Sequence, residues 1–294
     1  MAVASQEAAA EAAGAVAGNK VAWGRMNFPL MSAIKVIWNQ VRNVVLSLIT
    51  LYLILCALLF YFQRSLLYFP TALPPGAACC IEKLSVDGAE LTLSVKAGPG
   101  NDAIIYFGGN AEEVSATLDE FAGHFPEHGI VLQHYRGYGG STGKPSEAVL
   151  HADAQAVYDL VKTRYSNIAV VGRSLGSGVA IRVAANNPVS QLVLVTPYDS
   201  ILSLARGRFP FVPVSLLLRD KFLSIDYAPL IEVPVLAIIA EQDQLVPHSH
   251  TDVLLNAFAP GISRTVTIPG TDHNTIGSEE NYYAVILEFL TQNR

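Results

Sequence analysis

The fold of this chain is decided by the stretch Asn167-Ile-Ala-Val-Val-Gly-Arg-Ser-Leu-Gly-Ser-Gly178. The β-branched apolar run from Ile168 to Val171 predicts a buried strand, and the segment from Val179 to Ala185 predicts a helix. Between them, Gly172-Arg-Ser-Leu-Gly176 predicts a tight turn that carries Ser174 at its tip. Glycines on both sides leave room where side chains would collide with the neighbouring strand or helix. Ser174 is therefore a candidate nucleophile, and the alternative is a turn of small residues that serves packing alone.

The composition predicts one domain of ordinary size together with a membrane segment. The 294 residues are 51% hydrophobic and only 15% charged, and their mean hydropathy is +0.35, which is apolar for a soluble enzyme. A net charge of −6 provides no broad basic surface for nucleic acid. Cys56, Cys79 and Cys80 are too few for a disulfide framework and lack zinc spacing, so free thiols or one intermolecular pairing are expected. No metal and no organic cofactor is implied.

A charge-free run from Val44 to Phe62 predicts a transmembrane helix, because at about 1.5 Å per residue it reaches across a hydrocarbon core of about 30 Å. Before it lie a tail and juxtamembrane segment, residues 1–43. Within that segment, residues 28–41 predict either an amphipathic helix on the membrane surface or a simple approach to the span. A buried core helix would show a polar face, and a cleaved signal peptide would not begin with more than forty residues.

Basic residues flanking the span predict its orientation. Arg25, Lys35 and Arg42 precede the span, whereas Arg64 stands alone after it until Lys83. The positive-inside rule then places the N-terminus in the cytoplasm. The catalytic domain is accordingly expected on the outer side of the membrane, periplasmic or lumenal.

After a proline-rich linker at residues 63–79, residues 80–294 alternate strand and helix patterns. Apolar runs predict strands at residues 84–86, 91–96, 103–107, 129–135, 168–171, 192–196, 235–239 and 265–268. Helical patterns occur at residues 111–125, 148–165, 179–185 and 279–292. Strands of Val, Ile and Leu that alternate with helices predict an α/β domain with a mostly parallel sheet covered on both faces, and Asp87-Gly88 predicts an opening hairpin.

A serine nucleophile needs a base and an acid, and in hydrolases with this strand–turn–helix arrangement both follow the serine in sequence. Four histidines precede Ser174, and two others, at 248 and 250, fit the start of a solvated helix. His273 lies in a Gly-containing loop after the last predicted strand and is the candidate base. Two aspartates qualify as the acid: Asp243, which stands nearer the usual position, and Asp199, which also suits a helix N-cap. Glu241 is a weaker third choice.

Two backbone N–H groups are expected to bind the oxyanion. One is that of Leu175, at the start of the helix after the serine. The other is expected from the glycine-rich loop Phe107-Gly-Gly-Asn-Ala-Glu112, with Asn110 or Ala111 as the donor. An ordinary strand-to-helix turn is the alternative for this loop.

Two further segments belong to the expected rim of the site. Arg136, in a second glycine-rich loop, could pair with an acid such as Asp199, although packing is the commoner role for such a residue. Residues 201–231 form the one sizeable insertion where a lid is expected. An apolar lid over the serine would favour acyl chains, and two helices that complete the core are an equal alternative.

Taken together, these motifs resemble those of the bud-emergence-type α/β-hydrolases, small membrane-anchored serine hydrolases related to protein depalmitoylases. The resemblance runs from about Leu66 to the C-terminus and depends on five motifs: Gly108-Gly-Asn-Ala111, Tyr135-Arg-Gly-Tyr-Gly139, Gly172-Arg-Ser-Leu-Gly176, Asp243 before Val246-Pro247, and Gly270-Thr-Asp-His-Asn274. It implies an α/β-hydrolase fold with a short lid, a triad of Ser174, Asp243 and His273, and ester or thioester hydrolysis. The family usually has His-Gly-Asn where this chain has Gly108-Gly109-Asn110, and an acid where it has His134.

The sequence thus predicts a membrane-anchored serine hydrolase for carboxylic esters or thioesters, with acyl or lipid-like substrates at the membrane surface. Two alternatives stay open. One is a peptidase or amidase of the same fold, and the other is a non-catalytic, membrane-tethered binding protein that uses the hydrolase fold.

Overall fold

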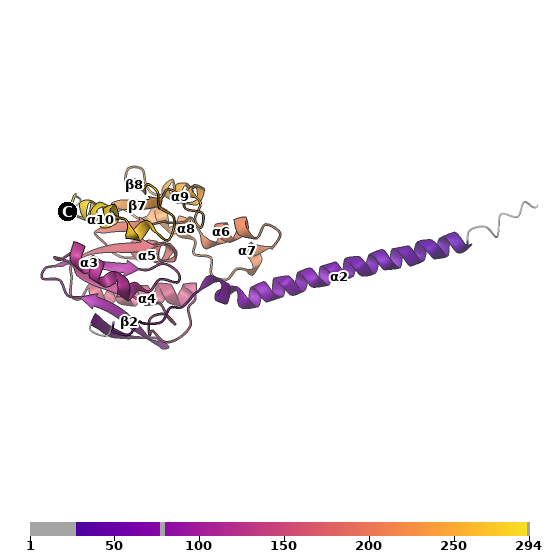
Figure 1. Cartoon of the computed structure of the whole chain (residues 1–294), viewed down its shortest axis with the longest axis horizontal. Helices are drawn as coiled ribbons and strands as arrows, with labels where there is room; N and C mark the ends of the chain where they lie inside the picture. The colour runs from indigo at the N-terminus through magenta and orange to yellow at the C-terminus, as the bar shows by residue number, and fades with distance from the viewer. Residues whose placement is uncertain (1–27, 77–79, 293–294) are drawn as a thin grey trace, which may run out of the picture. The chain divides into compact units, whose positions relative to one another are not determined.

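The structure is a computed structural model that describes residues 28–76 and 80–292 (Figure 1). The chain divides into two compact units, with the boundary between Ala57 and Leu58. The predicted N-terminal tail, Arg25 and Cys79 lie outside the described residues.

The first described element is a single helix, α2 (Phe28–Leu67), of 40 residues. In the described part of the chain it is the one helix long and apolar enough to cross a membrane. Its apolar side chains are exposed, for example Leu48 at 62% and Leu51 at 65%. The helix is longer than the predicted span in both directions, and residues 63–67 of the predicted linker form its last turn.

The second unit is built on an eight-stranded sheet of order β1-β2-β4-β3-β5-β6-β7-β8. β1 and β2 form the predicted opening hairpin, β2 pairs antiparallel with β4, and every later pairing is parallel. All eight predicted strands are confirmed. Their bounds are β1 (Ile81–Val86), β2 (Ala89–Lys96), β3 (Asp102–Phe107), β4 (Gly129–Gln133), β5 (Asn167–Arg173), β6 (Gln191–Val195), β7 (Val235–Ala240) and β8 (Ser263–Ile268).

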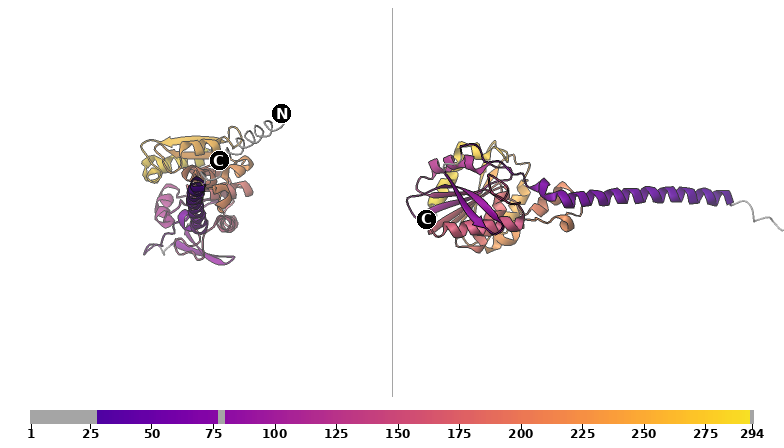
Figure 2. Two further views of the ribbon diagram at one scale, coloured as in Figure 1. Left: turned by 90° about the vertical axis from the view of Figure 1, so that its right-hand side faces the viewer. Right: turned by 90° about the horizontal axis from the view of Figure 1, so that it is seen from below.

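Helices cover both faces of this sheet (Figure 2). The longer helices are α4 (Glu147–Val161), α5 (Leu175–Asn186) and α10 (Glu280–Gln292), and the shorter ones are α3 (Leu118–His124), α6 (Ile201–Arg208), α7 (Val214–Leu217), α8 (Ser224–Tyr227) and α9 (His248–Leu255). Single 3-10 turns are η2 (Val114–Thr117), η3 (Ala228–Leu230) and η4 (Ile276–Ser278). The helix predicted from Ala111 begins only at η2, because Ala111 has φ +60 and the Glu113 carboxylate caps the N–H groups of Ser115 and Ala116.

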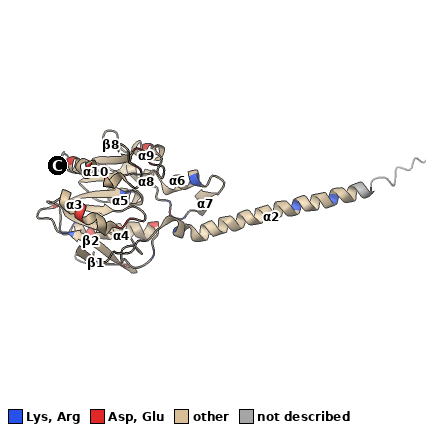
Figure 3. Ribbon diagram, viewed as in Figure 1, with Lys and Arg blue, Asp and Glu red and all other residues tan. Residues whose placement is uncertain are grey.

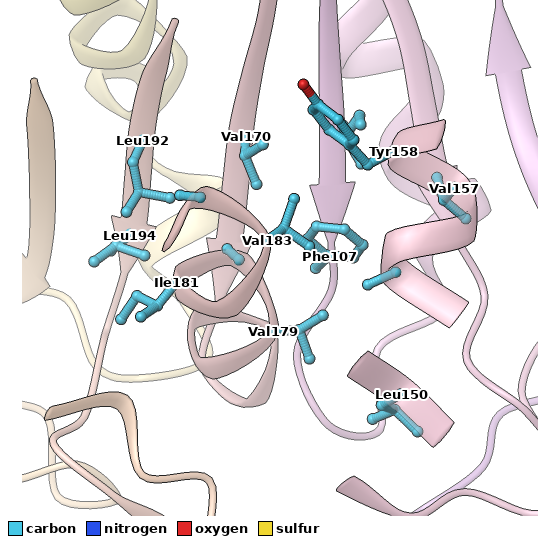
Figure 4. Close-up of a cluster of buried hydrophobic side chains, with 14 of the residues drawn as sticks. Phe107, Leu150, Val157, Tyr158, Val170, Val179, Ile181, Val183, Leu192 and Leu194 are labelled. Carbon is cyan, nitrogen blue, oxygen red and sulfur yellow. The ribbon is translucent and has the colours of Figure 1, made fainter. Parts of the chain in front are cut away.

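Successive side chains of the inner strands enter two separate apolar clusters, one on each face of the sheet. Val170 and Leu192 belong to the cluster beneath α4 and α5 (Figure 4). Their neighbours Val171 and Val193 belong to the cluster beneath α3 and α10. Burial on both faces explains why these strands are continuous apolar runs in the sequence. It also fixes the carboxyl ends of β5, β7 and β8 at one edge, from which the candidate site residues follow.

Candidate active site

Ser174 occupies a strained backbone position between β5 and α5. It has φ +48 and ψ −116 and is the N-cap of α5, a conformation that a non-glycine residue rarely adopts. A Cβ at Gly172 would lie 2.4 Å from the Gly176 carbonyl oxygen, and one at Gly176 would lie 2.0 Å from that of Phe107. Both glycines are therefore required by close backbone approach, as the sequence predicts.

His273 and Asp243 lie in line behind the serine. His273 Nε2 is 2.8 Å from Ser174 Oγ, and His273 Nδ1 is 2.7 Å from Asp243 Oδ2. The Asp243 side chain is 2% exposed and that of His273 is 11% exposed. A neutral imidazole held in this way can accept the hydroxyl proton through Nε2 while the carboxylate accepts from Nδ1.

Parallel pairing of β7 with β8 brings the aspartate and histidine loops together. Asp243 follows β7, and its Oδ1 accepts the N–H groups of Leu245 and Val246 at 2.9 and 2.8 Å. The two loops are joined where the Gln242 N–H donates to the Thr271 carbonyl at 2.8 Å. Asp243 is thus fixed through one oxygen and presents the other to His273.

The alternative acids have other partners. Asp199 Oδ1 lies 2.6 Å from Nδ1 of His250, at the start of α9, so it forms a separate carboxylate–imidazole pair. Glu241 accepts the Gly270 N–H at 2.8 Å. Of the three candidate acids, the geometry brings Asp243 to the histidine that contacts the serine.

Asn110 and Ala111, two of the three oxyanion candidates, line a pocket of ≈ 190 Å³ beside the serine. Its walls come from three segments, Gly109–Glu112, Arg173–Ser174 and His273–Asn274. The Gly109 N–H donates to Glu112 Oε2 at 2.6 Å, and the Ala111 N–H donates to Asn110 Oδ1 at 3.1 Å. Of the two predicted donors in this loop, the Asn110 N–H is therefore the better candidate to act with the Leu175 N–H.

The side chain of Asn110 joins this loop to the end of α2. Its Nδ2 donates to the Leu67 carbonyl at 2.6 Å, and its Oδ1 accepts from the Phe69 N–H at 3.0 Å and from the Tyr138 hydroxyl at 2.8 Å. Leu67 and Phe69 belong to the second unit. The candidate oxyanion residue Asn110 is thus held by the chain segment that follows the end of α2.

Sequence reasoning missed a second set of residues behind the site, Glu112 and Arg173. Arg173 Nη1 lies 3.5 Å from Glu112 Oε2, and its Nη2 donates to the carbonyls of His273 and Asn274 at 3.3 and 3.1 Å. Arg173 therefore connects the loop that carries Asn110 and Glu112, through the ion pair, to the histidine loop, through two backbone carbonyls. The only signal in the sequence is that Arg173 stands inside the serine turn.

Tyr106 gives the Glu112 carboxylate of this ion pair a neutral hydrogen-bond donor. Burial, together with the charge of Glu112, raises the pKa of Tyr106 well above its ordinary value. Tyr106 therefore stays protonated, and its hydroxyl donates to Glu112 Oε1 at 2.6 Å. Both oxygens of Glu112 are thus occupied, which fixes the loop that begins at Gly108.

The structure decides between the alternatives that the sequence left open for two segments of the rim. Arg136 does not pair with Asp199; it forms a two-point ion pair with Asp153 at 2.8 Å, because α4 passes beside its loop. The lid insertion is present, but none of its residues lines the serine pocket. Its apolar side chains instead line a cavity of ≈ 140 Å³ with the last turns of α2, formed by Leu59, Gln63, Leu66, Leu67, Ile201, Ala205, Phe209, Val212, Val214, Leu217 and Leu218.

Among the described residues, no group of three or more His, Cys, Asp and Glu side chains is arranged to hold a metal ion.

A mostly parallel sheet with a strained serine between strand and helix, and a histidine within reach of it, defines the class of α/β-hydrolases. No family model matches the chain. An uncharacterized protein of Mycobacterium tuberculosis is 33% identical over 72% of this chain and 80% of its own length. Protein bem46 of Schizosaccharomyces pombe is 26% identical over 87% of this chain and 95% of its own length. The chain belongs to the α/β-hydrolase family that includes bem46.

A solved structure supports the fold independently. An esterase of Pyrococcus furiosus superposes with a TM-score of 0.62 at 19% identity, covering 77% of this chain and 97% of the esterase. The predicted fold class and the family resemblance are both confirmed.

Proposed function

We propose that this chain is a membrane-anchored serine hydrolase that cleaves carboxylic esters or thioesters of acyl or lipid-like substrates. The observation that carries the proposal is the line of contacts from Asp243 through His273 to Ser174, at 2.7 and 2.8 Å. The strained backbone of Ser174 supports the same assignment, because strain of this kind is found where a nucleophile is presented to substrate.

In the acylation step, Ser174 Oγ attacks the substrate carbonyl while its proton passes to His273 Nε2. Asp243 stabilises the imidazolium that forms, and the N–H groups of Leu175 and Asn110 bind the developing oxyanion. Collapse of the tetrahedral intermediate breaks the bond to the alcohol or thiol, which leaves with the proton from His273. Water then attacks the acyl-serine with the same histidine as base, and the carboxylic acid is released.

The proposed reaction is tested by a fluorophosphonate probe, which labels only an activated serine. The wild-type chain is expected to be labelled and Ser174→Ala is expected to stay unlabelled, with hydrolysis of a short p-nitrophenyl ester lost in parallel. Ser177→Ala, a change at a serine one turn further along α5, is the matched control and should keep both signals. Absence of labelling in the folded wild-type protein would favour the non-catalytic binding protein instead.

The substrate proposal depends on the anchor. A hydrolase held at a membrane meets lipid and lipid-modified molecules more often than soluble ones. A panel of esters, thioesters and amides graded by acyl length would identify the class, with kcat/KM as the readout. A preference for amides would turn the assignment to the peptidase or amidase of the same fold.

The anchor proposal is that α2 crosses the bilayer once, with the N-terminus in the cytoplasm and the catalytic unit on the periplasmic or lumenal side. Its support is the exposed apolar surface of α2 and the excess of Arg and Lys before the span. A reporter that is active only outside the cytoplasm, fused after Arg294, is expected to give signal. A cytoplasmic reporter at the same position is the control, and signal from it alone would reverse the orientation.

A further inference from the structure

The segment from the end of α6 through α7 exposes large apolar side chains. We refer to residues 206–219 as the apolar hairpin. Leu216 is 84% exposed and Phe211 is 88% exposed, the two highest values among the large apolar side chains from Leu58 onward, and Phe209 is 44% exposed. Single exposed apolar residues are ordinary on a soluble surface, but three on one short hairpin need a reason.

All charged residues of the apolar hairpin are basic. Its sequence, Arg206-Gly-Arg-Phe-Pro-Phe-Val-Pro-Val-Ser-Leu-Leu-Leu-Arg219, contains three arginines and no acidic residue, whereas the whole chain has a net charge of −6. All three arginines are exposed, and Figure 3 shows basic residues on α6. Exposed aromatic and aliphatic side chains flanked by arginines suit the boundary between acyl chains and anionic headgroups.

Contacts with the end of α2 fix the position of the apolar hairpin. Gln63 donates to the Leu217 carbonyl at 3.1 Å and accepts the Arg219 N–H at 2.7 Å. Next to it, Arg64 forms a two-point ion pair with Asp220 at 2.9 and 3.2 Å. These contacts begin one residue after Phe62, where the predicted hydrocarbon span ends, so they hold the hairpin beside the end of that span.

A cation–π contact strengthens this junction. The Arg219 guanidinium lies 4.1 Å from the centre of the Phe60 ring, inside the predicted span, and the neighbouring Tyr61 is 79% exposed, as an interfacial position requires. The side chains that hold the hairpin are therefore themselves of the kind found at a membrane–water interface.

We propose that the apolar hairpin is a second membrane contact, which lies in the headgroup region of an anionic bilayer surface beside the point where α2 leaves it. This inference depends on the membrane span of the proposed function. Two attachments, the helix and the hairpin, then hold the catalytic unit in one orientation on the membrane, whereas the helix alone would leave it free to tilt.

The test measures the depth of the hairpin in the full chain, reconstituted in lipid nanodiscs that contain phosphatidylglycerol. Cys56, Cys79 and Cys80 are replaced by serine, and an environment-sensitive NBD label is attached at Leu216→Cys. The matched control carries the label at Leu287→Cys on α10, which is also exposed but lies at the opposite end of the unit from α7 (Figure 1). Hydrolysis of a water-soluble ester confirms that each labelled protein keeps its site.

The label at residue 216 is expected to emit at shorter wavelength than the label at residue 287, and to be quenched at least about twofold more by lipids with a headgroup-level nitroxide. Equal emission and quenching at the two positions in an inserted protein would overturn the second contact and leave the span intact. A blue-shifted label that nitroxide lipids do not quench would mean that protein, such as a second copy, covers the hairpin, and would also overturn it. Failure of the chain to enter nanodiscs at all would instead reject the span.

Discussion

Asp243→Asn is expected to lower kcat for ester hydrolysis by about 10,000-fold, as loss of the carboxylate does in other serine hydrolases with a Ser-His-Asp triad. The asparagine keeps an oxygen for the N–H groups of Leu245 and Val246, so the loop is expected to stay folded. Its amide group, however, would donate to His273 Nδ1 and move the imidazole proton to Nε2. The nitrogen that faces Ser174 could then no longer accept the hydroxyl proton.

Asp199→Asn is the matched control for this variant. Asp199 and Asp243 both follow parallel strands, both lie close to a histidine Nδ1, at 2.6 and 2.7 Å, and both are candidate acids in the sequence. Only Asp243 is joined to the serine through its histidine, so Asp199→Asn should leave kcat near that of the wild type. Steady-state kinetics on a short ester measures both, and a collapse of activity in Asp199→Asn alone would exchange the two assignments.

Gly176→Ala is expected to destabilise the catalytic unit by about 3 kcal/mol or more and to remove activity. The added Cβ would lie 2.0 Å from the Phe107 carbonyl oxygen and 2.6 Å from that of Gly108. Both obstacles are backbone atoms, so no side chain can rotate away, and the ends of β3 and α5 must separate. Overpacking of this kind costs about 1–3 kcal/mol when side chains can adjust, and more is expected here.

Gly123→Ala is the matched control for that change. Gly123 lies in α3, and a Cβ there would meet nothing within 4 Å, so alanine should stabilise the helix by about 0.5–1 kcal/mol. Thermal unfolding of the detergent-solubilised chain, followed by circular dichroism, compares the two variants. Similar midpoints for Gly176→Ala and the wild type would show that the elbow does not require the close approach described.

The inner strands β3 to β7 were predictable because they are buried on both faces and therefore appear as nearly continuous apolar runs. The serine turn was predictable because its glycines are imposed by backbone contacts between neighbours in the sheet. The first and last residues of α2 were not predictable from the sequence. An uncharged run indicates which residues suit the hydrocarbon layer, and it does not indicate where the helix begins and ends. Gln63 and Arg64 are good helix formers, and their partners Leu217, Arg219 and Asp220 favour continuation of the helix.

Long-range polar pairs were the least predictable part of the site. Arg173 and Glu112 come from different strand ends, and nothing local in either segment indicates that they meet. The partner of Arg136 was not predictable for the same reason, because several acids follow strands, whereas Asp153 lies on α4. A sequence thus predicts which residue types gather at an edge more readily than how they pair.

The contacts of Asn110 have a consequence for release of this hydrolase by proteolysis. A cut before Leu58 would free a unit that keeps Leu67 and Phe69, the backbone partners of Asn110, and also Arg64, the partner of Asp220. A cut between Leu67 and Phe69 would instead remove the Leu67 carbonyl from Asn110 and Arg64 from Asp220, and would leave Asn110 with Phe69 and Tyr138. The position of a cut within the last turns of α2 therefore decides which contacts of Asn110 and Asp220 the released unit keeps.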